Sequence, residues 1–413
     1  MLNNEINKKT EEIKNNLLNK ISEIKRMIDN TNYNLNKKMN NNLIEKELKE
    51  LLRLNEKTRY LLVREHEFKN NPINLKYKVD ITNINDNYGV NDIFEIFISF
   101  KDLTEYIVSP NYNNFNLDIY IFDNNLKISS LSGHKNHVKT IKYFIDKGNY
   151  NEYLISGDSN QIVIVWDISL NFIIKYQINT NYESYSSIFS CLIFLSNNYC
   201  DYSNYNYLDN YIIISSRNTT KDIDKSSTKI YSLKNGQFLR NIKDSNNHSV
   251  FYLLAWYNKK NEKFYIIQLA EKKIVINNLL EDELYCELIN EPEDSHYSGF
   301  IYNKDDKDFL FSSSFNGRID IWDLYNKKIF QVIKLNKCNL FSIIKWNKKY
   351  IIVADYKNIS LKIIDLTKNK VVEEIIGEHK RPLKCIKKWY SYKKFGEMLL
   401  ISGNDKIIKL WHF

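Results

Sequence analysis

The sequence predicts two parts: a helical segment of residues 1–70 and a longer all-β part of residues 71–413. The 413 residues include only three alanines, which disfavours an all-helical chain. From Pro72 onward, short apolar and aromatic runs alternate with Asn, Asp, Lys and Ser clusters, which is typical of strands. One such segment also recurs along the chain, and recurrence at a fixed period indicates a repeat architecture.

Residues 1–70 contain no Trp, Gly or Pro, and their apolar residues recur at helical spacing. The stripe that would lie on one helix face consists of Leu17, Ile21, Ile24, Ile28 and Leu35. These residues occupy the positions that form the seam of a coiled coil. We therefore expect an α-helical arm that forms a coiled coil with a partner or a second copy. Packing of the stripe against its own chain is the alternative.

The recurring segment is a polar turn, then alternating apolar residues, an aromatic residue, an Asp and an apolar residue. Its clearest copies are residues 156–167, 312–323 and 402–412. Two copies also have a histidine upstream of the Trp. The interval from His134 to Trp166 equals the interval from His379 to Trp411. Weaker copies align at the aromatic position, which gives Phe122, Trp166, Tyr231, Asn277, Trp322, Ile364 and Trp411.

The spacing of these positions supports a repeat of about 45 residues. Every interval between neighbouring positions is close to that period, except for the longer one between Trp166 and Tyr231. Polar insertions at 196–210 and 217–227 account for that surplus, and surface loops tolerate such length. The segments resemble the ends of WD40 repeats.

The resemblance implies a seven-bladed β-propeller over residues 71–413. The sequence ends with the third strand of the last repeat, so that blade needs a fourth strand from elsewhere. Residues 75–82 are the candidate, since an N-terminal strand closes the ring in this family. Such closure also removes an exposed sheet edge.

In WD40 proteins a His, a Ser or Thr, a turn Asp and the Trp form a hydrogen-bonded network within a blade. The resemblance assigns this structural role to His134, Ser156, Trp166, His248, His296, Trp322, His379, Ser402, Asp405 and Trp411. Asn160, Asn316 and Asn358 stand where the family has the turn Asp. Asn tolerates the turn but lacks the charge that holds the His, so we expect weaker networks there.

The resemblance also places the loops between repeats, and the loops before each third strand, on one face where WD40 proteins commonly bind peptides. The basic residues in or beside such loops are Arg217, Lys221, Lys225, Arg318, Lys380 and Arg381. If several converge, they favour an acidic or phosphorylated peptide. The alternative is that they are solvated side chains of a lysine-rich protein.

Enzymatic function is not expected. The chain lacks G-x-G-x-x-G, G-x-x-x-x-G-K, G-x-S-x-G, H-E-x-x-H and C-x-x-C motifs. The His, Ser and Asp that resemble a hydrolase triad recur at repeat positions, which favours packing. We expect no cofactor and no metal, since His134 and His137 lack a Cys or carboxylate at ligand spacing.

Neither a signal peptide nor an apolar run of membrane-spanning length is evident, so a reducing cytoplasmic or nuclear location is expected. The net charge of +9 is modest, with interleaved signs, and argues against a dedicated nucleic-acid reader. The sequence thus predicts a non-catalytic protein-interaction scaffold. A helical arm before seven WD40 repeats is similar to Atg16-type autophagy adaptors. G-protein β subunits and RNA-associated WD40 components are the alternatives.

Overall fold

The computed structural model describes the propeller part of the chain. The described residues are 76–80, 94–99, 104–111, 113–122, 126–146, 151–180, 188–194, 210–216, 228–242, 249–281, 283–289, 294–376, 379–391, 396–403 and 408–412. All of them belong to one unit, Asn74–Phe413. The predicted arm of residues 1–70, with its stripe from Leu17 to Leu35, lies outside the described residues.

The described residues form seven four-stranded antiparallel sheets and contain no helix. We number these sheets as blades 1 to 7 in chain order. Blade 1 contains β2 (Glu95–Ile98), β3 (Glu105–Pro110), β4 (Leu117–Ile121) and β5 (Leu126–Leu131). Blade 2 contains β6 (Val138–Ile145), β7 (Glu152–Asp158), β8 (Ile162–Asp167) and β9 (Ile173–Asn179). Blade 3 contains β10 (Ile188–Phe194), β11 (Tyr211–Ser216), β12 (Thr228–Ser232) and β13 (Phe238–Asn241).

The remaining four blades follow the same order of strands. Blade 4 contains β14 (Val250–Asn258), β15 (Lys263–Ala270), β16 (Ile274–Asn278) and β17 (Leu284–Leu288). Blade 5 contains β18 (His296–Lys304), β19 (Lys307–Ser314), β20 (Arg318–Asp323) and β21 (Lys328–Lys334). Blade 6 contains β22 (Leu340–Lys345), β23 (Tyr350–Asp355), β24 (Ser360–Asp365) and β25 (Lys370–Ile376). Blade 7 contains β26 (Leu383–Ser391), β27 (Gly396–Gly403), β28 (Ile408–His412) and β1 (Lys76–Asp80).

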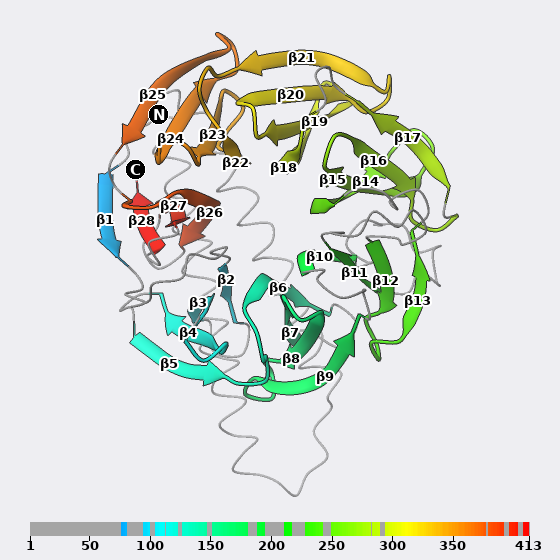
Figure 1. Ribbon diagram of the computed structural model, residues 1–413, viewed down its shortest axis with the longest axis vertical. Coiled ribbons are helices and arrows are strands. Elements are labelled where there is room, and N and C mark those ends of the chain that lie inside the picture. Colours follow the sequence, from blue (N-terminus) through cyan, green and yellow to red (C-terminus); the bar gives the residue numbers. More distant parts are fainter. Residues whose placement is uncertain are drawn as a thin grey trace, which may run out of the picture. The chain divides into compact units, whose positions relative to one another are not determined.

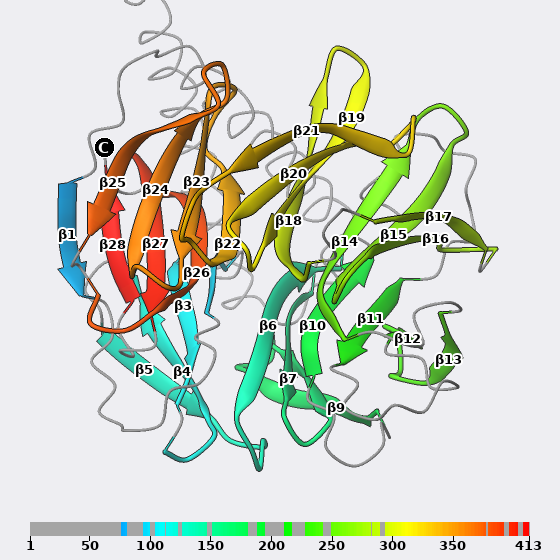
Figure 2. The same cartoon turned by 45° about the horizontal axis from the view of Figure 1, so that its top comes forward.

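The blades are arranged in a ring, with the first strand of each blade innermost (Figures 1 and 2). Inner strands of successive blades contact each other from β2 round to β26. Between the last blade and the first, Lys387 Nζ donates to Glu95 Oε2 at 2.7 Å, and Trp389 packs with Phe94. The ring is therefore closed. An all-β seven-bladed propeller is the fold class that the sequence predicts, and the structure confirms it for the residues that it describes.

Blade 7 contains strands from both ends of this unit. β1 pairs antiparallel with β28, with Lys76 opposite His412 and Tyr77 opposite Trp411. β1 is thereby the outermost strand of the last blade, at the outside of the ring (Figure 1). Backbone hydrogen bonds between β1 and β28 thus join the two ends of the ring without a covalent bond.

Burial follows the order of strands in each blade. The second strands are covered on both faces by neighbouring blades, so β7 and β23 are buried at every residue and are rich in Ile, Leu, Val and Tyr. The outer strands are mostly exposed, as in β9 and β25. The hydrophobic core is therefore divided into layers between adjacent blades. One such layer joins Ile155 of blade 2 to Ile212 of blade 3.

Candidate functional site

One end of the ring carries two kinds of connection. Strands alternate in direction, so the loops between blades and the turns between second and third strands lie at the same end of each sheet. We call this end the connector face. The turns between first and second strands, and between third and fourth strands, lie at the opposite face.

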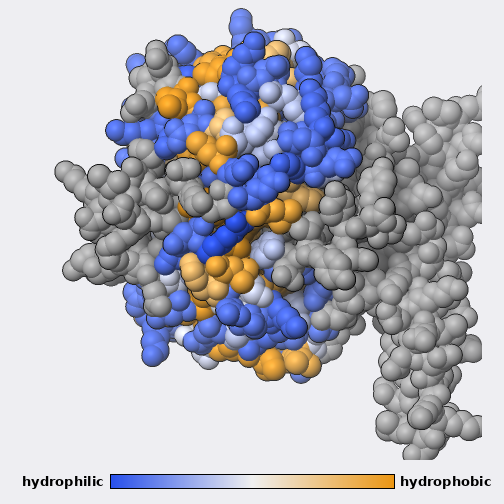
Figure 3. Space-filling model, turned by 90° about the vertical axis from the view of Figure 1, so that its right-hand side faces the viewer, coloured by the Kyte–Doolittle hydropathy of each residue, from blue (hydrophilic) through white to orange (hydrophobic). Residues whose placement is uncertain are grey.

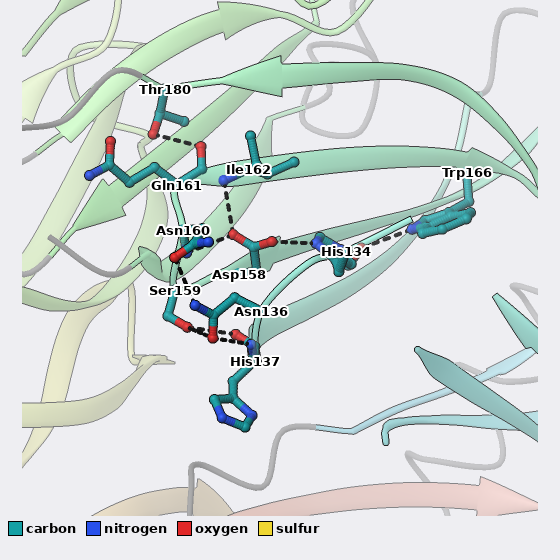
Figure 4. A network of polar contacts seen from close by, with 11 residues as sticks. His134, Asn136, His137, Asp158, Ser159, Asn160, Gln161, Ile162, Trp166 and Thr180 are labelled. Carbon is teal, nitrogen blue, oxygen red and sulfur yellow. Dashed lines mark hydrogen bonds and ion pairs between the residues drawn. The ribbon is translucent and has the colours of Figure 1, made fainter. Parts of the chain in front are cut away.

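Blade 2 contains the predicted hydrogen-bonded network (Figure 4). His134 Nε2 lies 2.6 Å from Ser156 Oγ, and Trp166 Nε1 donates to the same oxygen at 2.8 Å. His134 Nδ1 lies 2.9 Å from Asp158 Oδ2. All four side chains are buried. One arrangement satisfies every atom: Nδ1–H donates to the carboxylate, the Ser hydroxyl donates to Nε2, and Trp166 donates to the hydroxyl oxygen.

The carboxylate in this network corrects a prediction from the sequence. Asn160 occupies the family's turn Asp position, but Asp158, two residues earlier, supplies the charge for His134. Its other oxygen accepts the backbone N–H groups of Asn160 at 2.8 Å and Ile162 at 3.0 Å. Asp158 thus joins the histidine to the turn that follows β7. The expectation of a weaker network at Asn160 is therefore wrong, because a neighbouring residue takes over the role.

Blade 5 has only part of the network. Trp322 Nε1 donates to Ser312 Oγ at 3.0 Å, as in blade 2. The ring of His296 is fully buried, and neither of its nitrogens has a hydrogen-bond partner in the described part of the chain. Burial lowers the pKa of His296 to about 4. Ser314 stands where blade 2 has Asp158, so the carboxylate that holds His134 has no counterpart there.

The other predicted network residues are His248, His379, Ser402, Asp405 and Trp411. His379 and Trp411 are buried in blade 7. The backbone of Ser402 is part of β27. His248 and Asp405 lie outside the described residues.

Blades 3 and 4 are joined by a buried chain of one hydroxyl and two amide side chains that sequence reasoning missed. Thr228 Oγ1 donates to Gln268 Oε1 at 2.6 Å, and Gln268 Nε2 donates to Asn277 Oδ1 at 2.9 Å. All three side chains are buried. Asn277 occupies the position of the repeat's Trp, so a polar residue in that register was the signal available in the sequence.

Acidic side chains at the start of second strands also join blades, at the opposite face. Glu105 accepts from Trp389 Nε1 of blade 7 at 3.3 Å, and Asp308 accepts from Trp256 Nε1 of blade 4 at 2.9 Å. Both acids are buried. The donor and acceptor come from neighbouring blades, so their pairing is not visible in any single repeat.

The predicted basic residues separate into three groups. Lys380 and Arg381 are exposed in the loop between β25 and β26, at the connector face. Arg318 is different: it begins β20, is 8% exposed, and donates through Nη2 to Asp320 Oδ1 at 2.9 Å. It is bound inside the blade, so we withdraw it as a partner-binding residue. Arg217, Lys221 and Lys225 lie outside the described residues.

A row of stacked aromatic rings crosses blades 4 to 6 at the connector face, and the sequence analysis did not identify it. Phe251 stacks on Tyr297 with ring centroids 4.5 Å apart, and Tyr297 stacks on Phe341 at 4.4 Å. Phe341 stacks on Tyr356 at 4.7 Å. We call these four residues the aromatic ladder. Phe315, 38% exposed, lies 5.9 Å from Tyr297 and 6.3 Å from Phe341.

The local backbone explains why these rings align. Phe251, Tyr297 and Phe341 are each the second residue of an inner strand, where the register to the next strand shifts. A bulge of this kind redirects a side chain out of the regular alternation. Lys139 in blade 2 and Lys384 in blade 7 occupy the same register position. Tyr356 reaches the row from the turn that follows β23.

The charge at the connector face is mainly positive in the described part. The basic side chains there that are not buried are Lys135, Lys139, Lys272, Lys273, Lys337, Lys357, Lys380, Arg381 and Lys384. Glu271 is the one exposed acid among the described residues of these loops. Lys273 pairs with Glu287 of β17 at 2.5 Å. The described turns of the opposite face carry both signs, as in the turn from Lys304 to Lys307.

Comparison with known protein families agrees with the blade geometry. The family model of the WD domain, G-beta repeat, matches residues 125–167, which extend to the end of β8 and include the His134 network. The chain is a WD40-repeat protein. A search of the curated proteins finds no match. Among the described residues of this WD40-repeat protein, no helix is long and apolar enough to cross a membrane, and no group of three or more His, Cys, Asp or Glu is placed to hold a metal ion.

Proposed function

We propose that this WD40-repeat protein is a non-catalytic scaffold that binds other proteins at the connector face. The aromatic ladder carries the proposal. It places apolar rings on the rigid inner strands of three blades, at the end of the ring where basic side chains gather. Aromatic side chains are enriched in the cores of protein-binding surfaces, and charged side chains around such a core select partners of opposite charge.

The state of the buried His, Ser and Asp supports a structural role for them. His134 is 6% exposed, and Ser156 and Asp158 are 0% exposed. The Ser156 hydroxyl is bound by both His134 and Trp166. A nucleophile must reach a substrate carbonyl, and this oxygen is enclosed between strands. The arrangement therefore stabilises the blade and does not support a hydrolase.

For the cellular role we propose an adaptor that resembles the Atg16-type autophagy adaptors and acts in the cytoplasm. Residues 1–70 serve as the assembly element in this proposal, through the stripe from Leu17 to Leu35. The support is the order of the two parts in the sequence. The alternative roles are a G-protein-β-like subunit and an RNA-associated WD40 component.

The test compares the full chain with a truncation that begins at Asn74. Each is purified from cells under native conditions, its partners are identified by mass spectrometry, and its mass is measured by light scattering. We expect both preparations to retain partners of the propeller, and the full chain alone to be oligomeric or to carry an arm partner. If neither preparation retains any protein, the scaffold proposal is wrong. Capture of RNA that is lost steeply with added salt indicates the RNA-associated alternative.

A further inference from the structure

We propose that the aromatic ladder binds a short segment of a partner protein in which aromatic or aliphatic residues lie beside Asp or Glu. This inference rests on the proposed scaffold function and adds the chemistry of the ligand. It uses the ladder residues Phe251, Tyr297, Phe341 and Tyr356, together with Phe315 and the basic residues around them.

The length of the ladder matches a short peptide. Its consecutive ring centroids are 4.5, 4.4 and 4.7 Å apart. The row is therefore at most about 14 Å long, which an extended chain covers in about four residues. Because the rings belong to the inner strands of blades 4 to 6 and to one turn, they form one surface of fixed shape. A rigid aromatic surface loses little conformational entropy when a ligand binds.

The way the rings stack decides what can bind them. Tyr297 is covered by Phe251 on one face and by Phe341 on the other, at interplanar angles of 24° and 26°. Phe341 is likewise enclosed between Tyr297 and Tyr356. The inner rings therefore present their edges, which carry the positive end of the ring quadrupole. Ring edges attract carboxylates and pack against apolar side chains.

The same stacking disfavours nucleic-acid bases. Proteins that bind single strands offer free aromatic faces on which successive bases stack. In the ladder, only the outer faces of Phe251 and Tyr356 are not covered by another ladder ring. A row of bases has no platform here, so we favour a peptide over RNA.

The charges around the ladder favour acidic residues in that peptide. Lys384 occupies the ladder's register position in blade 7, next to blade 6, and Lys139 occupies it in blade 2, which blade 3 separates from blade 4. Lys337 and Lys357 are exposed in loops of the connector face beside Phe341 and Tyr356. Attraction between these described lysines and a negative segment would speed association and select against basic peptides.

The outer rim of the propeller is a weaker candidate. Figure 3 shows the side on which β13 and β17 lie, where apolar patches are interrupted by hydrophilic ones. Exposed apolar residues there include Phe238 (49%), Leu239 (43%) and Leu284 (43%). Phe238 and Leu239 are followed by Arg240 and Asn241 in β13, and Leu284 begins β17 in the next blade. Single exposed apolar residues are normal on a protein surface and indicate no site.

The experiment selects peptides from a random 12-residue library displayed on phage, with the full chain immobilised. We expect the selected peptides to be enriched both in Phe, Trp, Tyr or Leu and in Asp or Glu. The same selection is run on the double variant Tyr297→Ser, Phe341→Ser, which removes the two inner rings. The matched control is Phe330→Ser, which removes a 62% exposed ring from β21, away from the ladder. Thermal melting confirms that each variant is folded.

The best selected peptide is then synthesised with a fluorescent label and titrated. We expect the double variant to weaken its binding by about tenfold or more, which is typical of losing central aromatic contacts, and the control variant to leave it unchanged. The charge-reversal variants Lys139→Glu and Lys384→Glu should each weaken binding in a salt-dependent manner. An unlabelled uridine 12-mer should not displace the labelled peptide from the protein.

Three results overturn the inference. The first is selected peptides without acidic enrichment, and the second is equal binding to wild type and the double variant. The third is displacement of the peptide by the uridine 12-mer. If the purified chain still carries protein partners in those cases, the scaffold function stands and only the ladder's role is wrong. Loss of all partners in the purification argues against the scaffold function itself.

Discussion

The buried imidazole of His296 makes a defined contribution to the pH dependence of folding. Burial lowers its pKa from 6.5 to about 4, and the nearby Arg318 acts in the same direction. Asp320 and Asp294 oppose the shift but do not overcome it. Between these two pKa values the unfolded chain binds a proton that the folded chain excludes. The contribution of His296 to stability is therefore complete above about pH 6.5 and is lost as the pH falls towards 4.

The magnitude follows from the size of the shift. One pKa unit corresponds to about 1.4 kcal/mol, so the whole shift is worth about 3 kcal/mol and roughly 2 kcal/mol of it is lost between pH 7 and pH 5. The variant His296→Phe keeps a ring of similar size beside Trp322, whose centroid is 6.2 Å from that of the histidine. It removes the titration without opening a cavity.

The assay is urea denaturation of wild type and His296→Phe at several pH values from 7 to 5. Carboxylates and other histidines titrate in both proteins, so the difference between the two curves isolates His296. We expect wild type to lose about 2 kcal/mol more than the variant over that range. Parallel loss in the two proteins would refute the reasoning, because it would mean that His296 is protonated in the folded blade or is exposed to water.

Three further predictions concern single interactions, each measured as the change in the free energy of unfolding. Ser156→Ala leaves the buried Trp166 and His134 nitrogens without their shared partner, and we expect a loss of about 2 to 4 kcal/mol; a loss under about 1 kcal/mol would show that water replaces the hydroxyl. Gly317→Ala should cost about 1 to 3 kcal/mol, since Gly317 has a φ of +77° and an added Cβ would lie 2.3 Å from a backbone oxygen. At the equivalent turn position Gln161 has a φ of 68°, so Gln161→Gly should be neutral or slightly stabilising, and equal losses at both turns would contradict this account. Trp389→Phe removes a donor to the buried Glu105 at the seam between blades 7 and 1, and should lower stability by about 1 to 3 kcal/mol, whereas an unchanged midpoint would show that the bond is not formed.

Several features of the fold follow from local sequence. Alternating apolar residues that end in an aromatic residue predict a strand, because side chains alternate across a sheet and the apolar ones must be covered. Recurrence of that pattern near Trp166, Trp322 and Trp411 predicts the repeat and so the propeller. The weak repeats are placed by register alone. That register puts Asn277 at the position of the repeat's Trp, and the structure places Asn277 in the third strand of blade 4.

The tertiary structure decided the contacts between residues that are distant in sequence. Asp158 and Asn160 are both polar turn residues, and only the position of the His134 ring shows which one holds it. Arg318 is a candidate loop cation in the sequence, whereas in the fold Asp320 binds it inside the blade. Local pattern describes which face a side chain occupies, but not which neighbour it meets there.

The aromatic ladder shows the same division most clearly. Phe251, Tyr297 and Phe341 belong to three different repeats, and each is an ordinary aromatic residue at the start of a strand. The sequence by itself indicated WD40 repeats and the register in which they recur. Packing of the inner strands β14, β18 and β22 then brings those strand ends together, and a bulge in each strand turns the aromatic side chain towards its neighbour. That surface exists only in the folded ring, because its contacts are made between blades and not within them.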